Sequence, residues 1–376
     1  MPWQETSVMT LRQEFVLLAA QEGANMRELC RRYGISPTTG YRLLARWQQG
    51  GVAGLADRSR RPQGSPRTTP AESEAAVVAL RDRHPAWGGR KLHHALRAQG
   101  VMEHVPAPST ITAILRRHGR LAPQQRPVHA YQRFEHPAPN DLWQMDFMGQ
   151  PELPTGRVHP LTILDDHSRF ALTVAACAHQ RHELVQAHLT AAFRRYGLPH
   201  IILTDNGPPW GSSGMGGITA LEAWLLRLGI EPWHGRPRHP QTQGKVERLH
   251  RTLWAEAIGP RSFTDLASAQ ARFETWRQTY NGERPHEALA DAVPASRYSP
   301  SPRVFPEPLP PIIYGPEDLV RQVREQGAIG FRGRSWFISR GLAGLPVAVR
   351  PTPDDGCFAV WYCQRQVATI DLIDRG

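Results

Sequence analysis

One stretch of the chain places an acidic residue among large apolar ones: Trp143-Gln144-Met145-Asp146-Phe147. Its strand-forming residues predict a β-strand over 142–148, inside a region where strands and helices alternate. A carboxylate flanked by Trp, Met and Phe is costly to bury unless it is paired with a cation or bound to a metal. The stretch therefore predicts a central strand that carries a chemically active side chain, Asp146.

Two more acidic residues follow in distinctive settings. Asp205 ends a predicted strand in Leu203-Thr204-Asp205-Asn206-Gly207. Glu247 lies on a predicted helix in Gly244-Lys245-Val246-Glu247-Arg248. Mg²⁺ takes one or two protein carboxylates per ion and fills its other positions with water and phosphate oxygens. Three carboxylates can therefore hold two ions for in-line attack on a phosphodiester.

Strands and helices alternate around these residues. The strand candidates are 142–148, 159–165, 169–176, 200–204 and 230–234, and the helix candidates are 182–196, 219–228, 243–257 and 264–280. Thr219 and Glu222 form a possible helix-capping box, and Gly197 and Gly229 stand where helices are expected to end. This pattern predicts an α/β catalytic core over residues 122–298.

A first helical unit is expected over residues 1–57. Ser36 can cap its third helix, with Pro37 in the first position. The expected buried stripe of that helix is Tyr41, Leu44 and Trp47, with Arg42 and Arg46 left outside to contact DNA. Three short helices in this order are typical of a helix-turn-helix DNA-binding domain, although any small three-helix bundle shares the spacing.

A basic segment, 58–69, separates this unit from a second one over 70–121. Arg58, Arg60 and Arg61 make the segment a candidate DNA-binding arm, and a solvated linker explains its composition nearly as well. The second unit has helical periodicity, with a helix opened by Pro108-Ser109. It is interpreted as a second helix-turn-helix or winged-helix-like DNA-binding domain, and a structural helical spacer is the alternative.

The C-terminal part begins with a proline-rich stretch, 299–311, which contains six prolines and is expected to be an extended linker. Short strand candidates follow at 336–338, 347–349, 358–362 and 367–370. With glycine-rich turns between them, these strands predict a small β-barrel of SH3-like type over 312–376.

Composition bounds the partners and the compartment. The formal net charge of +11 over 376 residues favours a polyanionic partner such as double-stranded DNA. The chain has four cysteines, and their spacing matches neither a zinc site nor the disulfide framework of a secreted protein: Cys30, Cys177, Cys357 and Cys363. No zinc is therefore expected, and the protein is expected to work in a reducing compartment. The N-terminus does not read as a signal peptide, and no window reaches the length of a membrane span. We therefore expect a cytoplasmic protein that does not act in a membrane.

The surroundings of the acidic residues carry a resemblance. Residues 239–253 read His-Pro-Gln-Thr-Gln-Gly-Lys-Val-Glu-Arg-Leu-His-Arg-Thr-Leu, and residues 280–286 read Tyr-Asn-Gly-Glu-Arg-Pro-His. With the order Asp, Asp, Glu, the chain resembles the retroviral-integrase-like transposases of bacterial insertion sequences, and among these the insertion-sequence-481 type. The resemblance implies a ribonuclease-H-like core with a DDE motif and a bacterial, nucleoid-associated enzyme.

The resemblance also implies the chemistry of the site. Asp146 and Asp205 would bridge two Mg²⁺ ions, Glu247 would complete the second ion's site, and Mn²⁺ would be a substitute. The metal would activate water, and later a DNA 3′-hydroxyl, so that the enzyme cleaves strands at the ends of a mobile element and joins them to target DNA. Two ends imply a homo-oligomer, at least a dimer, when assembled on DNA.

The spacing of the acidic residues departs from the family pattern, and two other aspartates are alternative metal ligands. Asp205 and Glu247 are separated by 41 residues, longer than is usual in the wider class, and a glycine-rich insertion at 208–217 explains the excess. Asp165 and Asp166 are rival metal ligands, but their place between a strand and Arg169 favours a turn held by local hydrogen bonds.

Several neighbouring polar residues are assigned provisional roles. Lys245 and Arg248 are expected to be free to reach DNA phosphate from the helix that carries Glu247. Asn206, His239, Gln241 and Gln243 are close to the predicted site and are as apt to brace loops as to act in it. Tyr280 is interpreted as core packing and not as the nucleophile of a tyrosine recombinase.

Two other functions remain open from the sequence. A DNA-binding regulator derived from a transposase would keep the helix-turn-helix units and leave the acidic residues idle. A metal-dependent nuclease would cut DNA without joining strands.

Overall fold

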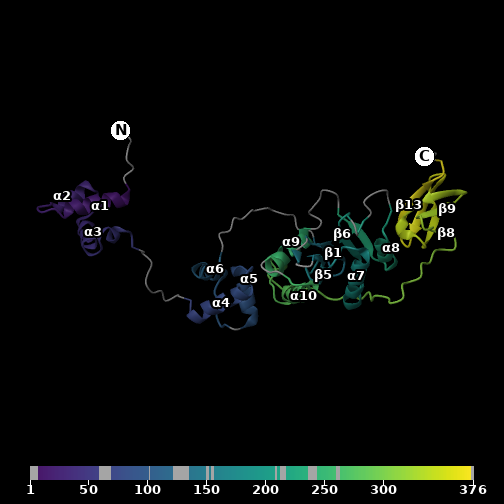
Figure 1. The fold of residues 1–376 in the computed structure, drawn as a ribbon, viewed down its shortest axis with the longest axis horizontal. Coiled ribbons are helices and arrows are strands. Elements are labelled where there is room, and N and C mark those ends of the chain that lie inside the picture. Colours follow the sequence, from purple (N-terminus) through teal and green to yellow (C-terminus); the bar gives the residue numbers. More distant parts are fainter. Residues whose placement is uncertain are drawn as a thin grey trace. The chain divides into compact units, whose positions relative to one another are not determined.

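The computed structural model describes residues 7–58, 69–100, 102–121, 135–149, 152–153, 156–207, 210–211, 217–235, 244–259 and 263–373. The chain forms two compact units, Met1–Thr68 and Thr69–Gly376, which are traced in Figure 1. None of the helices in the described ranges is long and apolar enough to cross a membrane.

The first unit is a three-helix domain. It consists of α1 (Val8–Ala19), α2 (Met26–Arg32), α3 (Pro37–Gly50) and a closing 3₁₀ turn, η1 (Gly51–Leu55). The side chain of Ser36 accepts a hydrogen bond from the backbone N–H of Thr39, and Pro37 occupies the first turn of α3, as predicted. Phe15, Cys30 and Leu43 are buried at the centre of the domain.

The buried face of α3 agrees with the prediction at Leu44 and Trp47, which pack against the core, and differs from it at Tyr41. Tyr41 is 59% exposed, whereas Gly40 and Leu43 are buried. A Cβ atom on Gly40 would lie 2.6 Å from Cys30 Sγ, so the missing side chain lets α3 approach α2 closely and turns Tyr41 outward. Arg46 is not free outside either, because its guanidinium donates to the carbonyl of Ala56 behind η1.

The second unit begins with another three-helix cluster. Its helices are α4 (Ala71–Arg83), α5 (Gly89–Gln99) and α6 (Pro108–Arg117). They enclose an apolar core that includes Val77, Trp87, Leu92 and Ile111. Pro108 starts α6 at the predicted position.

A five-stranded sheet forms the centre of the second unit. Its strands are β1 (Leu142–Phe147), β4 (His159–Asp165), β5 (Ala171–Cys177), β6 (Ile201–Thr204) and β7 (Glu231–His234). Their order is β5-β4-β1-β6-β7, with β4 antiparallel to both neighbours and β1, β6 and β7 parallel. This order and these directions are those of the expected ribonuclease-H-like core. A short hairpin, β2 (Glu152–Leu153) with β3 (Gly156–Arg157), was not predicted.

Helices cover both faces of this sheet. On one face α7 (His182–Tyr196) and α8 (Ala220–Arg227) pack against residues such as Trp143 and Met145. On the other face lie α9 (Gly244–Leu253), a π-helical turn η3 (Trp254–Ile258) and α10 (Leu266–Gly282). Because side chains alternate along a strand, Gln144 and Asp146 belong to the face that α9 covers. Two 3₁₀ turns, η4 (Glu287–Leu289) and η5 (Pro294–Ser296), follow α10.

The proline-rich stretch 299–311 is extended, as predicted, and it is also packed on the core. Phe305 and Leu309 join the apolar cluster under α7 and α8. The guanidinium of Arg303 donates to the carbonyls of Pro199, Leu228 and Gly229. This stretch is therefore a strap that closes the ends of two helices.

Gly197 shows how closely the strap approaches the helix ends. Its φ of +76° ends α7 in a backbone conformation that favours glycine, and a Cβ atom there would lie 2.5 Å from the carbonyl oxygen of Ser301. The sequence predicted the helix end at Gly197 but not the strap that passes over it.

The predicted C-terminal barrel is not confirmed, because the described C-terminal strands form two separate sheets. A four-stranded antiparallel sheet has the order β13 (Arg365–Asp371), β12 (Cys357–Tyr362), β11 (Pro346–Pro351) and β8 (Leu319–Gln322). A separate hairpin pairs β9 (Ala328–Phe331) with β10 (Arg334–Phe337), and η6 (Arg340–Leu342) follows it. Within the described ranges, the two sheets share no ladder that would close a barrel.

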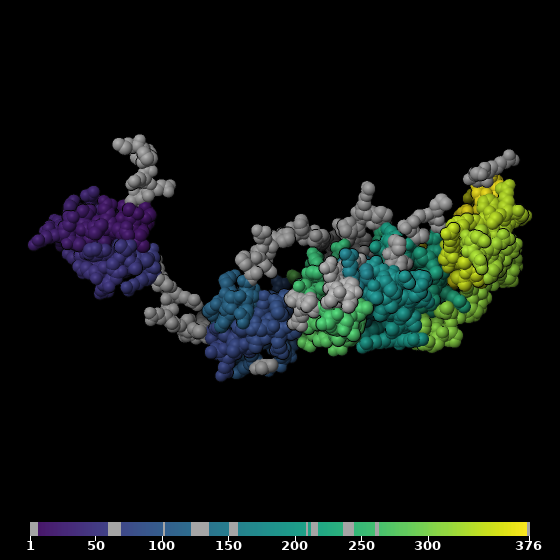
Figure 2. Space-filling model, in the orientation of Figure 1, coloured from purple at the N-terminus to yellow at the C-terminus, as the bar shows by residue number. Residues whose placement is uncertain are grey.

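The C-terminal sheets share an apolar core with α8, which packs on the five-stranded sheet. Ile218 and Ala223, at the start of α8, pack in the same cluster as Val347 and Tyr362. The hydroxyl of Ser339 donates to the carbonyl of Ile218 at 2.6 Å. The surface of the second unit is accordingly continuous from the teal catalytic segment to the yellow C-terminal strands (Figure 2).

Candidate active site

The three acidic residues lie on the elements that the sequence predicted for them. Asp146 is near the end of β1, Asp205 directly follows β6, and Glu247 is in the first turn of α9. β1 and β6 are parallel neighbours, with Gln144 opposite Leu203, so both aspartates belong to the same edge of the sheet. The backbone N–H of Val246 lies 3.3 Å from the side-chain oxygen of Gln144, which anchors the start of α9 to β1.

The charges of the three carboxylates influence one another. Burial, then the negative charges of Asp205 and Glu247, raise the pKa of Asp146 to about 7. Burial also raises the pKa of Asp205, against the N–H of Gly207 and the charge of His234, which lower it. Like charges in a half-buried site disfavour ionisation unless a cation is added.

The three carboxylates do not form a ready-made metal site in this structure. Among the residues that the structure describes, no three His, Cys, Asp or Glu groups are near enough to one another to form a ready three-ligand site. The arrangement places the three charges at one edge of the sheet, but the carboxylates are not as close together as the ligands of one metal ion.

His250 is a site residue that the sequence analysis missed. It lies one helical turn after Glu247, and its Nδ1 is 3.9 Å from the carboxylate of Asp146. Its Nε2 is 2.7 Å from the hydroxyl of Thr162, which itself donates to the carbonyl of Asp146. Burial lowers the pKa of His250 to about 4, so the ring is neutral near pH 7. The i, i+3 spacing from Glu247 was the available signal.

Lys245 is not free to reach DNA, contrary to expectation. Its ammonium is 2.5 Å from the carboxylate of Asp166, which is fully buried. Asp166 also accepts hydrogen bonds from the side-chain amide of Gln144 and the backbone N–H of His136. The helix periodicity of α9 could not show this contact, because Asp166 is 79 residues away in the sequence.

Asp165 and Asp166 are structural, as predicted. Asp165 accepts hydrogen bonds from the backbone N–H and hydroxyl of Ser168 and from the backbone N–H of Asn140. The two bonds from Ser168 are the local turn contacts that the sequence indicated, whereas the bond from Asn140 comes from 25 residues away. Because the oxygens of Asp165 and Asp166 accept these hydrogen bonds, the two residues stabilise the strand ends beside the site.

The other assigned residues divide into three groups. Asn206 braces a loop, since its amide donates to the carbonyl of Gly235 at 2.7 Å. Tyr280 is buried against Trp276 in the core, as predicted. Arg42, Arg58 and Arg248 are exposed and stay predicted DNA contacts. The predictions for Arg60, Arg61, His239, Gln241 and Gln243 lie outside the described residues.

Family models match successive parts of the chain. They are a helix-turn-helix domain at residues 11–63, a homeodomain-like domain at 39–115, an integrase core domain at 136–240 and again at 228–294, and the C-terminal domain of the IS481 family transposases at 318–376. The integrase core matches include the positions of Asp146, Asp205 and Glu247.

Two proteins of bacterial insertion elements are similar to this chain, and so is one chain of a solved structure. A 39.2 kDa protein of insertion element IS476 from Xanthomonas euvesicatoria is 28% identical over 65% of this chain and 69% of its own. A 31.7 kDa protein of insertion element IS407 from Burkholderia multivorans is 27% identical over 59% and 78%. A chain of the simian T-cell lymphotropic virus intasome structure aligns with 76% of this chain and 91% of its own, at 16% identity and a TM-score of 0.40. The chain is a DDE-type transposase, an enzyme of DNA integration, and its C-terminal part is similar to the C-terminal domain of the IS481 family transposases.

Proposed function

We propose that Asp146, Asp205 and Glu247 are the catalytic metal ligands of this transposase. The observation that carries the proposal is that the parallel neighbours β1 and β6 and the anchored first turn of α9 bring the three residues to one edge of the sheet. The raised pKa of Asp146, to which the charges of Asp205 and Glu247 contribute, agrees with this arrangement. A cation placed among the three would relieve the repulsion and let Asp146 ionise. The three side chains offer only carboxylate oxygens as ligands. Such ligands suit a hard cation such as Mg²⁺, whereas structural zinc sites are rich in cysteine thiolates.

The proposed cofactor is two Mg²⁺ ions per site, with Mn²⁺ as a substitute. Bound there, the ions would supply activation of water or of a DNA 3′-hydroxyl and stabilisation of the leaving oxygen. The protein's own part is orientation. Gln144 and the Lys245–Asp166 ion pair fix the start of α9, so that Glu247 is held on the same side of the sheet as Asp146.

DNA recognition is proposed for the N-terminal helical units. Exposed Arg42 and Arg58 in the first unit, together with Arg60 and Arg61, would bind phosphates of double-stranded DNA at the element's ends. Arg248 would bind DNA phosphate beside the active site. Because an element has two ends, the working assembly would be a homo-oligomer of at least two chains, acting at the bacterial nucleoid.

A plasmid-nicking assay tests the metal site. The full chain should nick supercoiled plasmid with Mg²⁺ or Mn²⁺, and Glu247→Gln should lose at least about 99% of the rate, since a ligand to the catalytic metal is removed. Glu231→Gln, which changes an exposed carboxylate at the start of β7, is the matched control and should behave as the wild type. Equal nicking by both variants would refute the assignment.

A strand-transfer assay separates a transposase from a non-joining nuclease. Pre-cut DNA carrying the element's ends and a free 3′-hydroxyl should become covalently joined to target plasmid, and Asp205→Asn should abolish joining and cutting together. Cutting without any joined product would favour the nuclease.

A further inference from the structure

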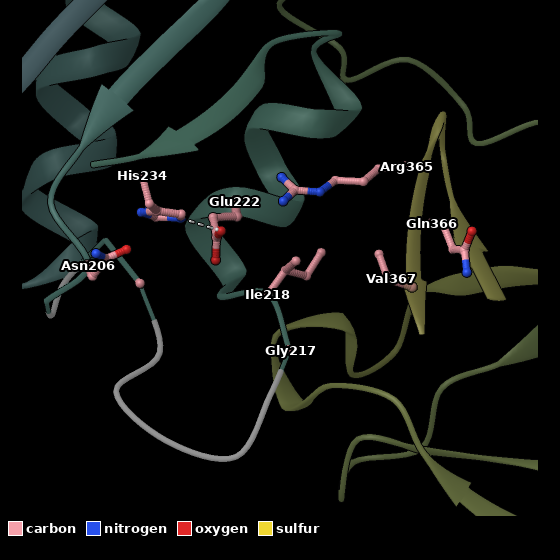
Figure 3. A pocket seen from close by; sticks show the side chains of 9 residues that line it. Asn206, Gly217, Ile218, Glu222, His234, Arg365, Gln366 and Val367 are labelled. Atoms are coloured by element: carbon pink, nitrogen blue, oxygen red, sulfur yellow. Dashed lines mark hydrogen bonds and ion pairs between the residues drawn. The ribbon is translucent and has the colours of Figure 1, made fainter. Parts of the chain in front are cut away.

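A buried acid and a histidine face each other beside the proposed metal site and have no part in the chemistry so far assigned. Glu222, on α8, is 5% exposed, and its Oε1 is 2.9 Å from Nε2 of His234 at the end of β7. Figure 3 shows the two side chains pointing toward one another from these elements. They line a cavity of about 320 Å³ that Asn206 also borders.

The second ring nitrogen of His234 reaches a proposed metal ligand. Nδ1 is 2.9 Å from the backbone carbonyl oxygen of Asp205. A carbonyl can only accept, so this nitrogen carries the hydrogen of the bond. His234 therefore spans the gap between the Glu222 carboxylate and the backbone of Asp205, and it fixes that carbonyl's direction.

Further contacts tie the same turn to β7. The side-chain amide of Asn206 donates to the carbonyl of Gly235, and the N–H of Gly235 donates to the carbonyl of Thr204. The carboxylate of Asp205 itself accepts a bond from the N–H of Gly207 at 3.2 Å. The exposed Asp205 side chain thus extends from a backbone that its neighbours hold in one conformation.

Glu222 is fixed from its other side. Its Oε2 accepts the backbone N–H of Thr219 at 2.6 Å, which completes the capping box of α8. The hydroxyl of Thr219 donates to the carbonyl of Trp210, whose ring stacks on Phe147, the neighbour of Asp146. The carboxylate of Glu222 is therefore set by contacts that connect the surroundings of both aspartates.

We propose that the Glu222–His234 pair is a positioning unit that holds Asp205 in the orientation needed to bind metal. The inference rests on the proposed role of Asp205 as a metal ligand. A capping box alone does not require the imidazole, and a buried carboxylate without a partner would be destabilising. Partners that orient a metal ligand typically change metal affinity by about 10- to 100-fold when they are removed.

Mn²⁺ binding to the full-length chain, followed by electron paramagnetic resonance of the free ion, tests this directly. His234→Ala should weaken Mn²⁺ binding at least about tenfold. His234→Asn should recover most of the affinity, because its amide can donate to the Asp205 carbonyl from nearly the same place as Nδ1. Glu222→Gln should also weaken binding, while keeping an acceptor for the N–H of Thr219. Melting temperatures are measured in parallel.

Two further variants complete the design. His182→Ala, which removes an exposed histidine beside Glu183 on α7, is the matched control and should bind Mn²⁺ as the wild type does. Asp205→Asn should lose binding; if it does not, the proposed metal site fails. If Asp205→Asn loses binding while folded His234→Ala and Glu222→Gln retain wild-type affinity, even with lower melting temperatures, the pair is structural and only the positioning inference fails.

Discussion

Lys245, two residues before the proposed catalytic Glu247 on α9, forms a buried ion pair with Asp166. Replacing Lys245 by Met leaves the fully buried Asp166 with its hydrogen bonds from Gln144 and His136 but without its cation. Removing one partner of a buried pair costs about 3–5 kcal/mol. We expect Lys245→Met to lower the free energy of unfolding by that amount, as measured by urea denaturation.

A double variant and a neighbouring arginine give the controls. Lys245→Met combined with Asp166→Asn removes both charges and should recover most of the lost stability. Arg248→Ala, at an exposed position of the same helix, should leave stability unchanged and reduce the salt dependence of DNA binding by about 0.9 in log–log slope. If Lys245→Met lowers that slope and leaves stability intact, Lys245 is a DNA contact after all.

Asp146 gives the metal-free protein a specific pH dependence. Its pKa is raised from 3.8 to about 7 by burial and by Asp205 and Glu247, so between these values the folded state holds a proton that the unfolded chain releases. The resulting stabilisation is complete below about pH 4 and is lost as the pH rises through 7. In EDTA, the wild type should lose about 2 kcal/mol more than Asp146→Asn between pH 5 and pH 8.

The comparison isolates one group because all other titrating residues are common to both proteins. Asp354→Asn, at an exposed turn before β12, should show the pH dependence of the wild type. Parallel stability curves for the wild type and Asp146→Asn would mean that the carboxylates do not interact.

At the scale of elements, one arginine ties the strap over 299–311 to the ends of two helices, beside the apolar packing of Phe305 and Leu309. Arg303 donates to the carbonyls of Pro199, Leu228 and Gly229 at the ends of α7 and α8. Hydrogen bonds from a charged donor are worth about 1.5–3 kcal/mol each, and solvent takes over part of that value when the side chain is lost. Arg303→Ala should therefore destabilise the protein by about 2–4 kcal/mol in calorimetric or denaturant unfolding.

Arg194, on α7, provides the matched comparison, because it contacts the same strap. Its guanidinium pairs with Glu307, and both side chains are exposed. Surface pairs contribute about 0–1 kcal/mol, so Arg194→Ala should have a small effect. Equal losses for the two arginine variants would show that the strap is not anchored through the helix ends.

The elements that the sequence predicted correctly are those with strong periodicity or clear end signals. Ser36 and Pro37 marked the start of α3, and Thr219 with Glu222 marked the capping box of α8. The strands β8 and β9 were not among the predicted strands. In β8 the apolar Leu319 and Val320 are both largely exposed, so no alternation identifies a buried face.

The site was predictable only where chemistry is local in the sequence. Asp146, Asp205 and Glu247 stand beside distinctive neighbours, and each lies on its predicted element. The contacts of Lys245 with Asp166 and of His250 with Thr162 join residues about 80 or more positions apart. Such pairs are set by the packing of α9 on the sheet, which no single-segment pattern describes.

At the scale of the whole molecule, the chain consists of two compact units, Met1–Thr68 and Thr69–Gly376. The proposed catalytic residues Asp146, Asp205 and Glu247, and the side chains that hold them in place, all belong to the second unit. A chain that lacks residues 1–68 should therefore keep the metal-dependent nicking of supercoiled plasmid and the main unfolding transition. Its affinity for DNA carrying the element's ends should fall, because Arg42 and Arg58 are removed along with Arg60 and Arg61.

The salt dependence of end binding measures how many phosphate contacts are lost. Each contact contributes about 0.9 to the log–log slope, so the deletion should reduce the slope by roughly 2 to 4, in fluorescence anisotropy titrations over a range of salt concentrations. Full-length protein with Arg42→Ala and Arg58→Ala should lose about 2. If the deletion leaves slope and end affinity unchanged while nicking persists, the element's ends are recognised by the second unit, through α4 to α6 or the catalytic core.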